Sequence, residues 1–371
     1  MKLLRVIASE FKNCADDFDI SFVPLARKTA EDKEYELEEI ADGLFVFSTV
    51  GIVGKNASGK TSVLDLLNVC YDILGTFRVE KREYSLNNVS LTMYFYHENY
   101  IYKYSTKLRE DPLSDKVLFS DQTIVRKAYY KSKANSIFEN EGYEAAAFEG
   151  ELPEDTSSIF FVIKKLGVLS AYSKSLDYGV DAYYDSFSAK KAFGLSDDVL
   201  KKIIRIFDEN ITGLEMIDDH NYRLGFCGRE EILSDKELYF RISAGTTKGL
   251  ALYTLVVLSL ANGFDIIIDE IENHFHKTLV ENIISLYKDK SINKKNATLI
   301  FATHYCEILD IFNRQDNIYI TKSDEKVKIY NMYKDFEVRS ELLKSKQFYN
   351  NVFKTAVNYE ALMDLKKELK K

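Results

Sequence analysis

The first residues that suggest chemistry lie at 54–61, where two glycines with four residues between them precede a lysine and a threonine. This spacing, G-x-x-x-x-G-K-T, is typical of a loop whose backbone N–H groups wrap phosphate oxygens at the positive N-terminus of a helix. Lys60 is expected to reach the outer phosphates, and the Thr61 hydroxyl is expected to ligate Mg²⁺. The predicted binding residues are Gly54, Lys55, Asn56, Ala57, Ser58, Gly59, Lys60, Thr61 and Ser62.

The elements on either side of this loop are those that a phosphate loop requires. An apolar run over 44–53 predicts a buried strand that enters the loop, and apolar residues at helical spacing after Thr61 predict a helix that ends near Gly75. An ordinary glycine-containing turn has no need of this strand and helix. We therefore predict a phosphate site rather than a simple turn.

Three further groups of polar residues lie at the ends of predicted apolar elements. The strand predicted over 264–268 ends in Asp269 and Glu270, and the strand predicted over 298–302 is followed by His304. Ser243 and Gly245 lie at the start of an apolar helix. Strands that alternate with helices predict a parallel sheet, whose functional side chains gather at the carboxyl ends of the strands.

The remaining segments predict an antiparallel part and several helices. Alternating apolar residues over 84–126 predict a hairpin and a third strand. Further strands are expected at 3–9, 18–24, 212–217, 221–226 and 237–242. The expected helices are 197–208 with Ser196 as N-cap, 243–260, 276–287 and the polar tail at 335–371. Residues 29–39 are expected to be a solvated acidic segment, and 128–195 show no clear periodicity.

The composition limits the class of protein and the compartment that the sequence can indicate. The chain has 371 residues, 46% of them hydrophobic, and a net charge of −8, so no global basic field indicates nucleic acid, although a local patch is left open. Four widely spaced cysteines predict free thiols in a reducing compartment. We expect no signal peptide and no apolar stretch near the roughly 18 residues of a membrane span. These features predict a cytoplasmic protein with no membrane partner.

The motifs stand in the order and approximate spacing of an ABC-type ATPase head. They are the loop at 54–61, a signature-like segment at 242–246, a Walker B strand that ends in Asp269 and Glu270, and His304 as the switch histidine. The resemblance implies an α/β fold of the P-loop NTPase superfamily, with a mixed parallel core sheet, an antiparallel β subdomain and a helical insert lobe. It also implies ATP and Mg²⁺ as cofactors, and a head-to-tail dimer with two ATP molecules sandwiched between protomers.

Each motif has a chemical reason. Asp269 can hold Mg²⁺ or its water beside Thr61, and Glu270 is the candidate base or water-orienting group. His304 can hydrogen-bond the γ-phosphate or the attacking water, the alternative being a buried histidine with an ordinary partner. Ser243 and Gly245 begin a helix and so form a second anion site, which in ABC heads faces the nucleotide of the other subunit.

Among ABC branches the chain is similar to the compact OLD-like and RecF-like heads of the SMC type. Thr246 stands where transporter domains carry glutamine, about 180 residues separate Thr61 from the signature-like segment, and no long heptad run predicts coiled-coil arms. The string over 269–276 resembles the OLD-like pattern D-E-x-E-x-x-x-H, although Lys277 stands where that family often has proline.

Two alternatives concern single residues. Glu272, His274 and His276 lie close enough in sequence for a metal site, but the resemblance places them in a loop that contacts the partner subunit. Gln122 is the glutamine in the interval where a glutamine loop would lie, and we give it little weight.

The resemblance predicts a nucleotide-binding core of residues 1–75 and 243–335, a β subdomain and signature lobe at 76–242, and a helical tail at 336–371. About 65 residues follow His304, too few for the Toprim nuclease domain of OLD proteins. The expected function is an ATP-hydrolysing dimer switch, similar to ATPase subunits of anti-phage defence systems that work with a separate nuclease or toxin effector. The alternatives are a RecF-like DNA-repair clamp and an assembly scaffold with little turnover.

Overall fold

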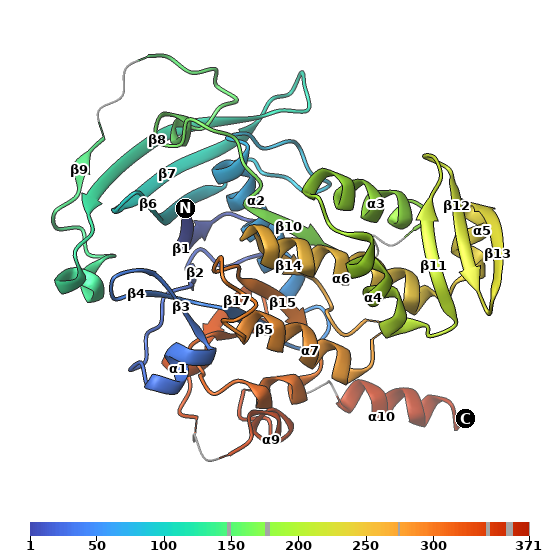
Figure 1. Ribbon diagram of the computed structural model, residues 1–371. Coiled ribbons are helices and arrows are strands. Elements are labelled where there is room, and N and C mark those ends of the chain that lie inside the picture. Colours follow the sequence, from blue (N-terminus) through green and yellow to red (C-terminus); the bar gives the residue numbers. More distant parts are fainter. Residues whose placement is uncertain (147–149, 175–178, 274, 339–341, 354–358, 371) are drawn as a thin grey trace. The chain divides into compact units, whose positions relative to one another are not determined.

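The computed structural model describes the chain except residues 147–149, 175–178, 274, 339–341, 354–358 and 371 (Figure 1). The chain forms two compact units. The first consists of Met1–Gly167 and Ala302–Lys371, and the second of Val168–Phe301. The predicted domains, which are 1–75 with 243–335, 76–242 and 336–371, divide the chain by expected role rather than by compactness. They stay a prediction.

The first unit contains an antiparallel sheet in the order β2-β1-β6-β7-β8-β9. Its strands are β1 (Lys2–Ser9), β2 (Phe18–Ser21), β6 (Ser90–His97), β7 (Tyr100–Glu110), β8 (Val117–Ala128) and β9 (Glu144–Ala145). A ribbon of β3 (Leu37–Ala41) and β4 (Leu44–Phe47) packs on it, because Leu44 and Val46 share a hydrophobic cluster with Leu4, Tyr94 and Ile101. The antiparallel strands β6, β7 and β8 confirm the hairpin and the third strand predicted over 84–126.

A second set of strands in the first unit carries the phosphate loop. β5 (Thr49–Val53) is buried throughout and leads through the loop into α2 (Lys60–Gly75), a 16-residue helix. β16 (Ile318–Ser323) pairs in parallel with β5, and β17 (Val327–Asn331) pairs antiparallel with β16. The remaining helices of this unit are α1 (Ala30–Tyr35), η1 (Lys131–Ser136), η2 (Ser158–Phe161), η3 (Cys306–Ile311), α8 (Met332–Asp335), α9 (Lys344–Tyr349) and α10 (Tyr359–Glu368).

Much of the segment 29–39 is exposed, as expected for a solvated acidic segment, but some of its acidic residues are buried. It contains α1 and the start of β3, and Asp32 is 7% and Glu36 0% exposed. Arg314, itself buried, donates to Asp32 at 2.7 Å, and the backbone N–H of Asn313 donates to Glu36 at 2.9 Å. The carboxylates are buried because a partner far along the chain satisfies them.

The second unit combines parallel strands with helices and a small sheet (Figure 1). β10 (Ser170–Ser173), β14 (Asp265–Ile268) and β15 (Leu299–Thr303) pair in parallel, and the last two residues of β15 already belong to the first unit. α3 (Ala182–Phe193) and α4 (Asp197–Phe207) pack on α6 (Ala244–Asn262), and α7 (Lys277–Lys288) follows β14. The small antiparallel sheet consists of β11 (Ile211–Met216), β12 (Asn221–Phe226) and β13 (Arg229–Ser234). The predicted α/β class, with parallel and antiparallel parts, is confirmed.

One predicted strand is wrong. Residues 237–242 were expected to extend, yet α5 spans Asp235–Arg241. Ser234 caps this helix by accepting from the backbone N–H of Glu237, whose side chain accepts in return from the backbone N–H of Ser234. This reciprocal capping box satisfies donors that a helix start leaves open, and it outweighs the strand preference of the aromatic residues that follow.

The helix α6 also corrects an expectation. Its 19 residues, with a mean hydropathy of 1.3, are long and apolar enough to cross a membrane by length and composition. The apolar stretch of this helix is 67% buried, as in the core helix of a folded domain, so its composition alone does not indicate a membrane-spanning helix. The four cysteines are free, as predicted: Cys14, Cys70 and Cys306 are buried and Cys227 is exposed.

Candidate functional site

The phosphate loop begins at Gly54, where there is no room for a side chain. A Cβ at this position would lie 2.4 Å from both Ser58 Oγ and Thr321 Oγ1, and 2.7 Å from the carbonyl oxygen of Thr321. Those two hydroxyls share a hydrogen bond of 2.6 Å, which ties the loop to β16. The loop is therefore built around a glycine and held by the neighbouring parallel strand.

Gly59 ends the loop and is the N-cap of α2. Its φ of +96° lies in the left-handed region that glycine adopts without strain, and a Cβ here would lie 2.3 Å from Val327 Cγ1. A glycine N-cap brings no side chain to the helix N-terminus, where backbone N–H groups and the helix dipole favour an anion. The two glycines and the helix start thus fit a phosphate group.

Lys60 lies across this loop and is only 5% exposed. Its ammonium donates to the carbonyl oxygens of Gly54 at 3.0 Å and Lys55 at 3.2 Å. It also donates to Nδ1 of His304 at 3.1 Å, although 244 positions separate the two residues in sequence. The structure therefore brings together the predicted lysine and the predicted switch histidine, both within the first unit.

Asp269 and Glu270 follow the buried strand β14 in the second unit. Asp269 is 7% exposed, and its backbone N–H donates to the carbonyl of Ser173 at 2.9 Å. Glu270 has a φ of +48°, in the left-handed region that a side chain with a Cβ seldom adopts. Strained backbone of this kind persists only where the surrounding structure holds it, and it is concentrated at functional sites. The carboxylates supply the oxygen ligands that Mg²⁺ prefers.

Ser243 is the N-cap of α6 and is exposed. Its Oγ accepts from the backbone N–H of Thr246 at 3.1 Å and lies 2.8 Å from Thr246 Oγ1. Gly245 is in the first turn of the same helix. The predicted second anion site is thus an accessible N-terminus of a 19-residue helix, within the second unit.

Gln122 and the possible metal ligands Glu272, His274 and His276 lie outside the phosphate loop at 54–61. Gln122, on β8, bonds Tyr104 at 2.8 Å and accepts from the backbone N–H of Ser158 at 2.7 Å, so its amide is engaged inside the first unit. His274 lies outside the described residues. Within the described part of the chain, no group of three or more His, Cys, Asp or Glu is arranged to hold a metal ion.

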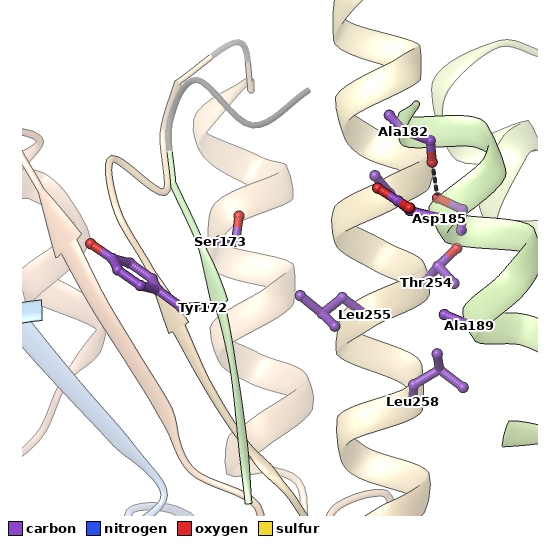
Figure 2. A pocket seen from close by; sticks show the side chains of 10 residues that line it. Tyr172, Ser173, Ala182, Asp185, Ala189, Thr254, Leu255 and Leu258 are labelled. Carbon is purple, nitrogen blue, oxygen red and sulfur yellow. Dashed lines mark hydrogen bonds between the residues drawn. The ribbon is translucent and has the colours of Figure 1, made fainter. Parts of the chain in front are cut away.

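The second unit also contains a cavity of about 200 Å³ between β10, α3 and α6 (Figure 2). Tyr172, Ser173, Asp185, Thr254 and Leu255 are among its lining residues. Ser186, also in its wall, donates from Oγ to the carbonyl of Ala182 on the same helix, which is the dashed line in Figure 2. None of the residues predicted from the motifs lines this cavity, and we assign it no ligand.

Thr321 contacts the phosphate loop and is not among the residues predicted from the sequence. It is buried on β16 and contacts Ser58 across 263 positions of sequence. A threonine in a strand is ordinary, so its sequence context carries no signal of this contact.

The strand, glycine loop and helix, with Lys60 against His304, define a P-loop ATPase of the ABC type. Residues 50–310 match the model of a family described as "AAA domain, putative AbiEii toxin, Type IV TA system". Because this match covers more than two thirds of the chain, the chain belongs to that family. No curated protein sequence matches the chain.

Solved structures with a related arrangement include SMC head domains. One is the SMC head domain from Thermotoga maritima, 11% identical, with a TM-score of 0.38 over 89% of this chain and 99% of that one. Another is an SMC head bound to the C-terminal winged-helix domain of ScpA, 13% identical, with a TM-score of 0.43 over 90% of this chain and 99% of that one. Likenesses at this level carry no argument about function, and the assignment rests on the family match.

Proposed function

We propose that this chain binds ATP with Mg²⁺ and hydrolyses it to ADP and phosphate, using an OLD-like dimerisation cycle as a switch. The observation that carries the proposal is the placement of Lys60. Its ammonium lies between two loop carbonyls and His304, at the N-terminus of α2. A phosphate oxygen that replaced one carbonyl would be held by the lysine, the helix start and the histidine together.

The roles of the side chains follow from their chemistry. Lys60 and the first N–H groups of α2 would hold the phosphates, and the resemblance to ABC heads assigns Thr61 and Asp269 as the residues that would hold the metal. Bound Mg²⁺ supplies positive charge that neutralises the phosphate oxygens. Glu270 orients or deprotonates the attacking water, and His304 donates to the transferred phosphoryl group. Phosphoryl transfer depends mostly on such positioning and charge stabilisation.

We further propose that two copies complete each site. The exposed N-terminus of α6, with Ser243 and Gly245, supports this proposal because it offers backbone N–H groups and a hydroxyl to an anion from outside. In a head-to-tail dimer this helix start would contact the nucleotide held by the phosphate loop of the other copy.

The proposed biological role is the ATPase component of a cytoplasmic anti-phage defence system with a separate nuclease or toxin effector. The family description, "putative AbiEii toxin, Type IV TA system", supports a place in a system of that kind. The separate effector follows from the resemblance to OLD-like ATPase subunits. Nucleotide-driven dimerisation would then present or withdraw the surface that contacts the effector.

The biochemical proposal is tested by comparing Lys60→Ala with Lys131→Ala. Lys131 is an exposed lysine on η1 that pairs with Asp42 at the surface, so it controls for loss of one positive charge. We expect Lys60→Ala to abolish binding of a fluorescent ATP analogue and ATP turnover, and Lys131→Ala to keep both. Tight ATP binding by Lys60→Ala would contradict the assignment of the loop.

The biological proposal is tested by tagging the chain in its native operon. We expect a nuclease or toxin to co-purify with the wild-type protein, and phage protection to be lost in Lys60→Ala. Repeated purification without a partner would contradict the two-component model. DNA affinity that falls steeply with salt would instead favour a RecF-like clamp, because phosphate contacts release counterions.

A further inference from the structure

Two buried hydroxyl groups tie the first turn of α6 to the neighbouring helix α3. Thr247 on α6 is 2% exposed and Tyr183 on α3 is 1% exposed, and their hydroxyl oxygens lie 2.6 Å apart. Thr247 Oγ1 donates to the carbonyl oxygen of Ser243 at 3.2 Å. Since a hydroxyl has one proton, Thr247 accepts in the other bond and Tyr183 is the donor. The three residues thus form a chain of hydrogen bonds that ends at the N-cap of α6.

The hydroxyl of Tyr183 does more than complete the packing of its ring. The ring lies 6.0 Å from that of Tyr222 on β12, a contact that phenylalanine would make equally well. Burial raises the pKa of Tyr183 to about 12, so the phenol keeps its proton at neutral pH and stays a donor. A buried donor without a partner is costly, and the bond to Thr247 removes this cost. The hydroxyl therefore acts on Thr247.

Thr247 transmits this contact to the N-cap. The carbonyl oxygen of Ser243 accepts from the backbone N–H of Thr247 at 2.9 Å as well as from its hydroxyl. A helical threonine divides between two rotamers, and only one of them bonds the carbonyl four residues back. The bond from Tyr183 stabilises that rotamer, because it is made to Oγ1 in this position. The carbonyl of the N-cap is thereby held by two donors.

The side chain of Ser243 is held in the same turn. Its Oγ accepts from the backbone N–H of Thr246 at 3.1 Å and lies 2.8 Å from Thr246 Oγ1. Of these two hydroxyls, only one can donate to the other, so one proton stays available to an acceptor outside the helix. A helix start binds an anion through several donors at once, and their common orientation decides how well it does so. Fixing the first turn therefore matters for the second anion site.

We propose that Tyr183 is a positioning residue that fixes the N-terminus of α6, through Thr247 and the carbonyl of Ser243, for the nucleotide bound by a second copy of the chain. The proposal rests on the proposed ATPase dimer, because it assigns the helix start a contact with that nucleotide. Tyr183 itself touches no nucleotide. A displacement of α3 on α6 breaks the bond between the two hydroxyls, so the second unit can change the affinity between copies without any change at the phosphate loop.

Four variants separate the hydrogen bond from packing. Tyr183→Phe removes one hydroxyl and keeps the ring. Thr247→Val removes the acceptor and keeps a branched side chain of similar size, whereas Thr247→Ser keeps the hydroxyl. Tyr184→Phe is the matched control, because this neighbouring tyrosine is 41% exposed.

Hydrogen exchange without nucleotide tests the hold on the helix start. We expect the amides of Thr246 and Thr247 to exchange about 3- to 10-fold faster in Tyr183→Phe and in Thr247→Val, as loss of one buried hydrogen bond allows. Adding Tyr183→Phe to Thr247→Val should give little further increase, because the two side chains act through one bond. Tyr184→Phe should exchange as the wild type does, and Thr247→Ser nearly so. Independent, additive effects of the two changes would overturn the proposed chain of hydrogen bonds.

Dimer affinity in the Glu270→Gln background tests the positioning role. With ATP and Mg²⁺, sedimentation over a dilution series should show Tyr183→Phe weakening the dimer about 5- to 50-fold, because each dimer contains the altered helix start twice. Affinity for a fluorescent ATP analogue, measured at a dilution where the protein is a single chain, should change less than threefold. Thr247→Ser should recover most of the dimer affinity, and Tyr184→Phe should leave it unchanged. A protein that is merely destabilised would lose ATP binding as well.

The outcomes separate this inference from the proposed function. A Glu270→Gln protein that dimerises equally well with and without Tyr183→Phe would overturn the positioning role alone. Equal losses in Thr247→Val and Thr247→Ser would also overturn it, because that pattern indicates packing rather than a hydroxyl. A Glu270→Gln protein that stays a single chain with ATP would refute the proposed dimer and, with it, the nucleotide contact of the helix start. The hold on Ser243 would then stand or fall by hydrogen exchange, which needs neither ATP nor a dimer.

Discussion

Replacing Gly54 by alanine tests the construction of the phosphate loop. The added Cβ would lie 2.4 Å from two hydroxyl oxygens and 2.7 Å from a backbone carbonyl oxygen of Thr321. The hydroxyls can rotate away, but the carbonyl belongs to β16, which is paired with β5 and β17. The loop must therefore move away from the strand, and the 2.6 Å hydrogen bond between Ser58 and Thr321 must break.

The magnitude follows from these two effects. Overpacking of a tight interior commonly costs about 1–3 kcal/mol. Loss of a buried hydrogen bond adds about 0.5–1.5 kcal/mol. We expect Gly54→Ala to lower the free energy of unfolding by about 2–4 kcal/mol and to weaken ATP binding more than tenfold, because the shifted loop no longer encloses the phosphates. Adding Ser58→Ala should relieve only part of the strain, since the carbonyl contact remains.

The assay is urea unfolding followed by far-UV circular dichroism, because the chain has no tryptophan for fluorescence. Gly167→Ala is the control, since a Cβ there would meet nothing within 4 Å. It should change the free energy of unfolding by less than about 1 kcal/mol. If Gly54→Ala were as stable as the control and bound ATP normally, the loop would not be packed on β16 as described.

Three further changes test other parts of the account. Ser243→Arg should leave ATP binding intact but block nucleotide-dependent dimerisation in gel filtration; unchanged turnover would contradict the signature assignment. Arg314→Met should lower the free energy of unfolding, measured in urea, by about 3–5 kcal/mol, because the buried carboxylate of Asp316 loses its cation. A loss below about 1 kcal/mol would contradict the buried pairing of Arg314 with Asp316. Iodoacetamide should modify exposed Cys227 well before Cys70, whose pKa burial raises, so that its thiolate stays scarce as pH rises; equal rates by peptide mass spectrometry would contradict the burial.

The phosphate loop was predictable because its signals are local. The strand, the glycine spacing and the helix all lie within about thirty residues, and each has its own physical reason. The helix at 197–208 was equally clear, because Ser196 and an apolar stripe define its start and its buried face. His304 was found through the order of the motifs, and its contact with Lys60 came only from the structure.

The wrong or missing predictions have other causes. Burial of Asp32 and Glu36 depends on partners at 313–317, almost 300 positions away, and charge in a sequence predicts solvent until such partners are known. The prediction of a strand at α5 gave the aromatic residues of this segment more weight than the capping signal of Ser234 and Glu237, whereas in the structure the capping box decides. The described residues of 128–195 form short elements and the 12-residue helix α3, and their sequence shows no sustained helical or strand period that would have indicated them.

The central claim is that ATP joins two copies of this chain, and the mass of Glu270→Gln in solution tests it most directly. This variant should bind ATP but hydrolyse it about 10²- to 10⁴-fold more slowly, so that an ATP-bound dimer accumulates. Light scattering with ATP and Mg²⁺ should give twice the 42.8 kDa of one chain, and a single-chain mass without nucleotide. Lys60→Ala combined with Glu270→Gln should stay at the single-chain mass. A mass of Glu270→Gln that is the same with and without ATP would contradict the account.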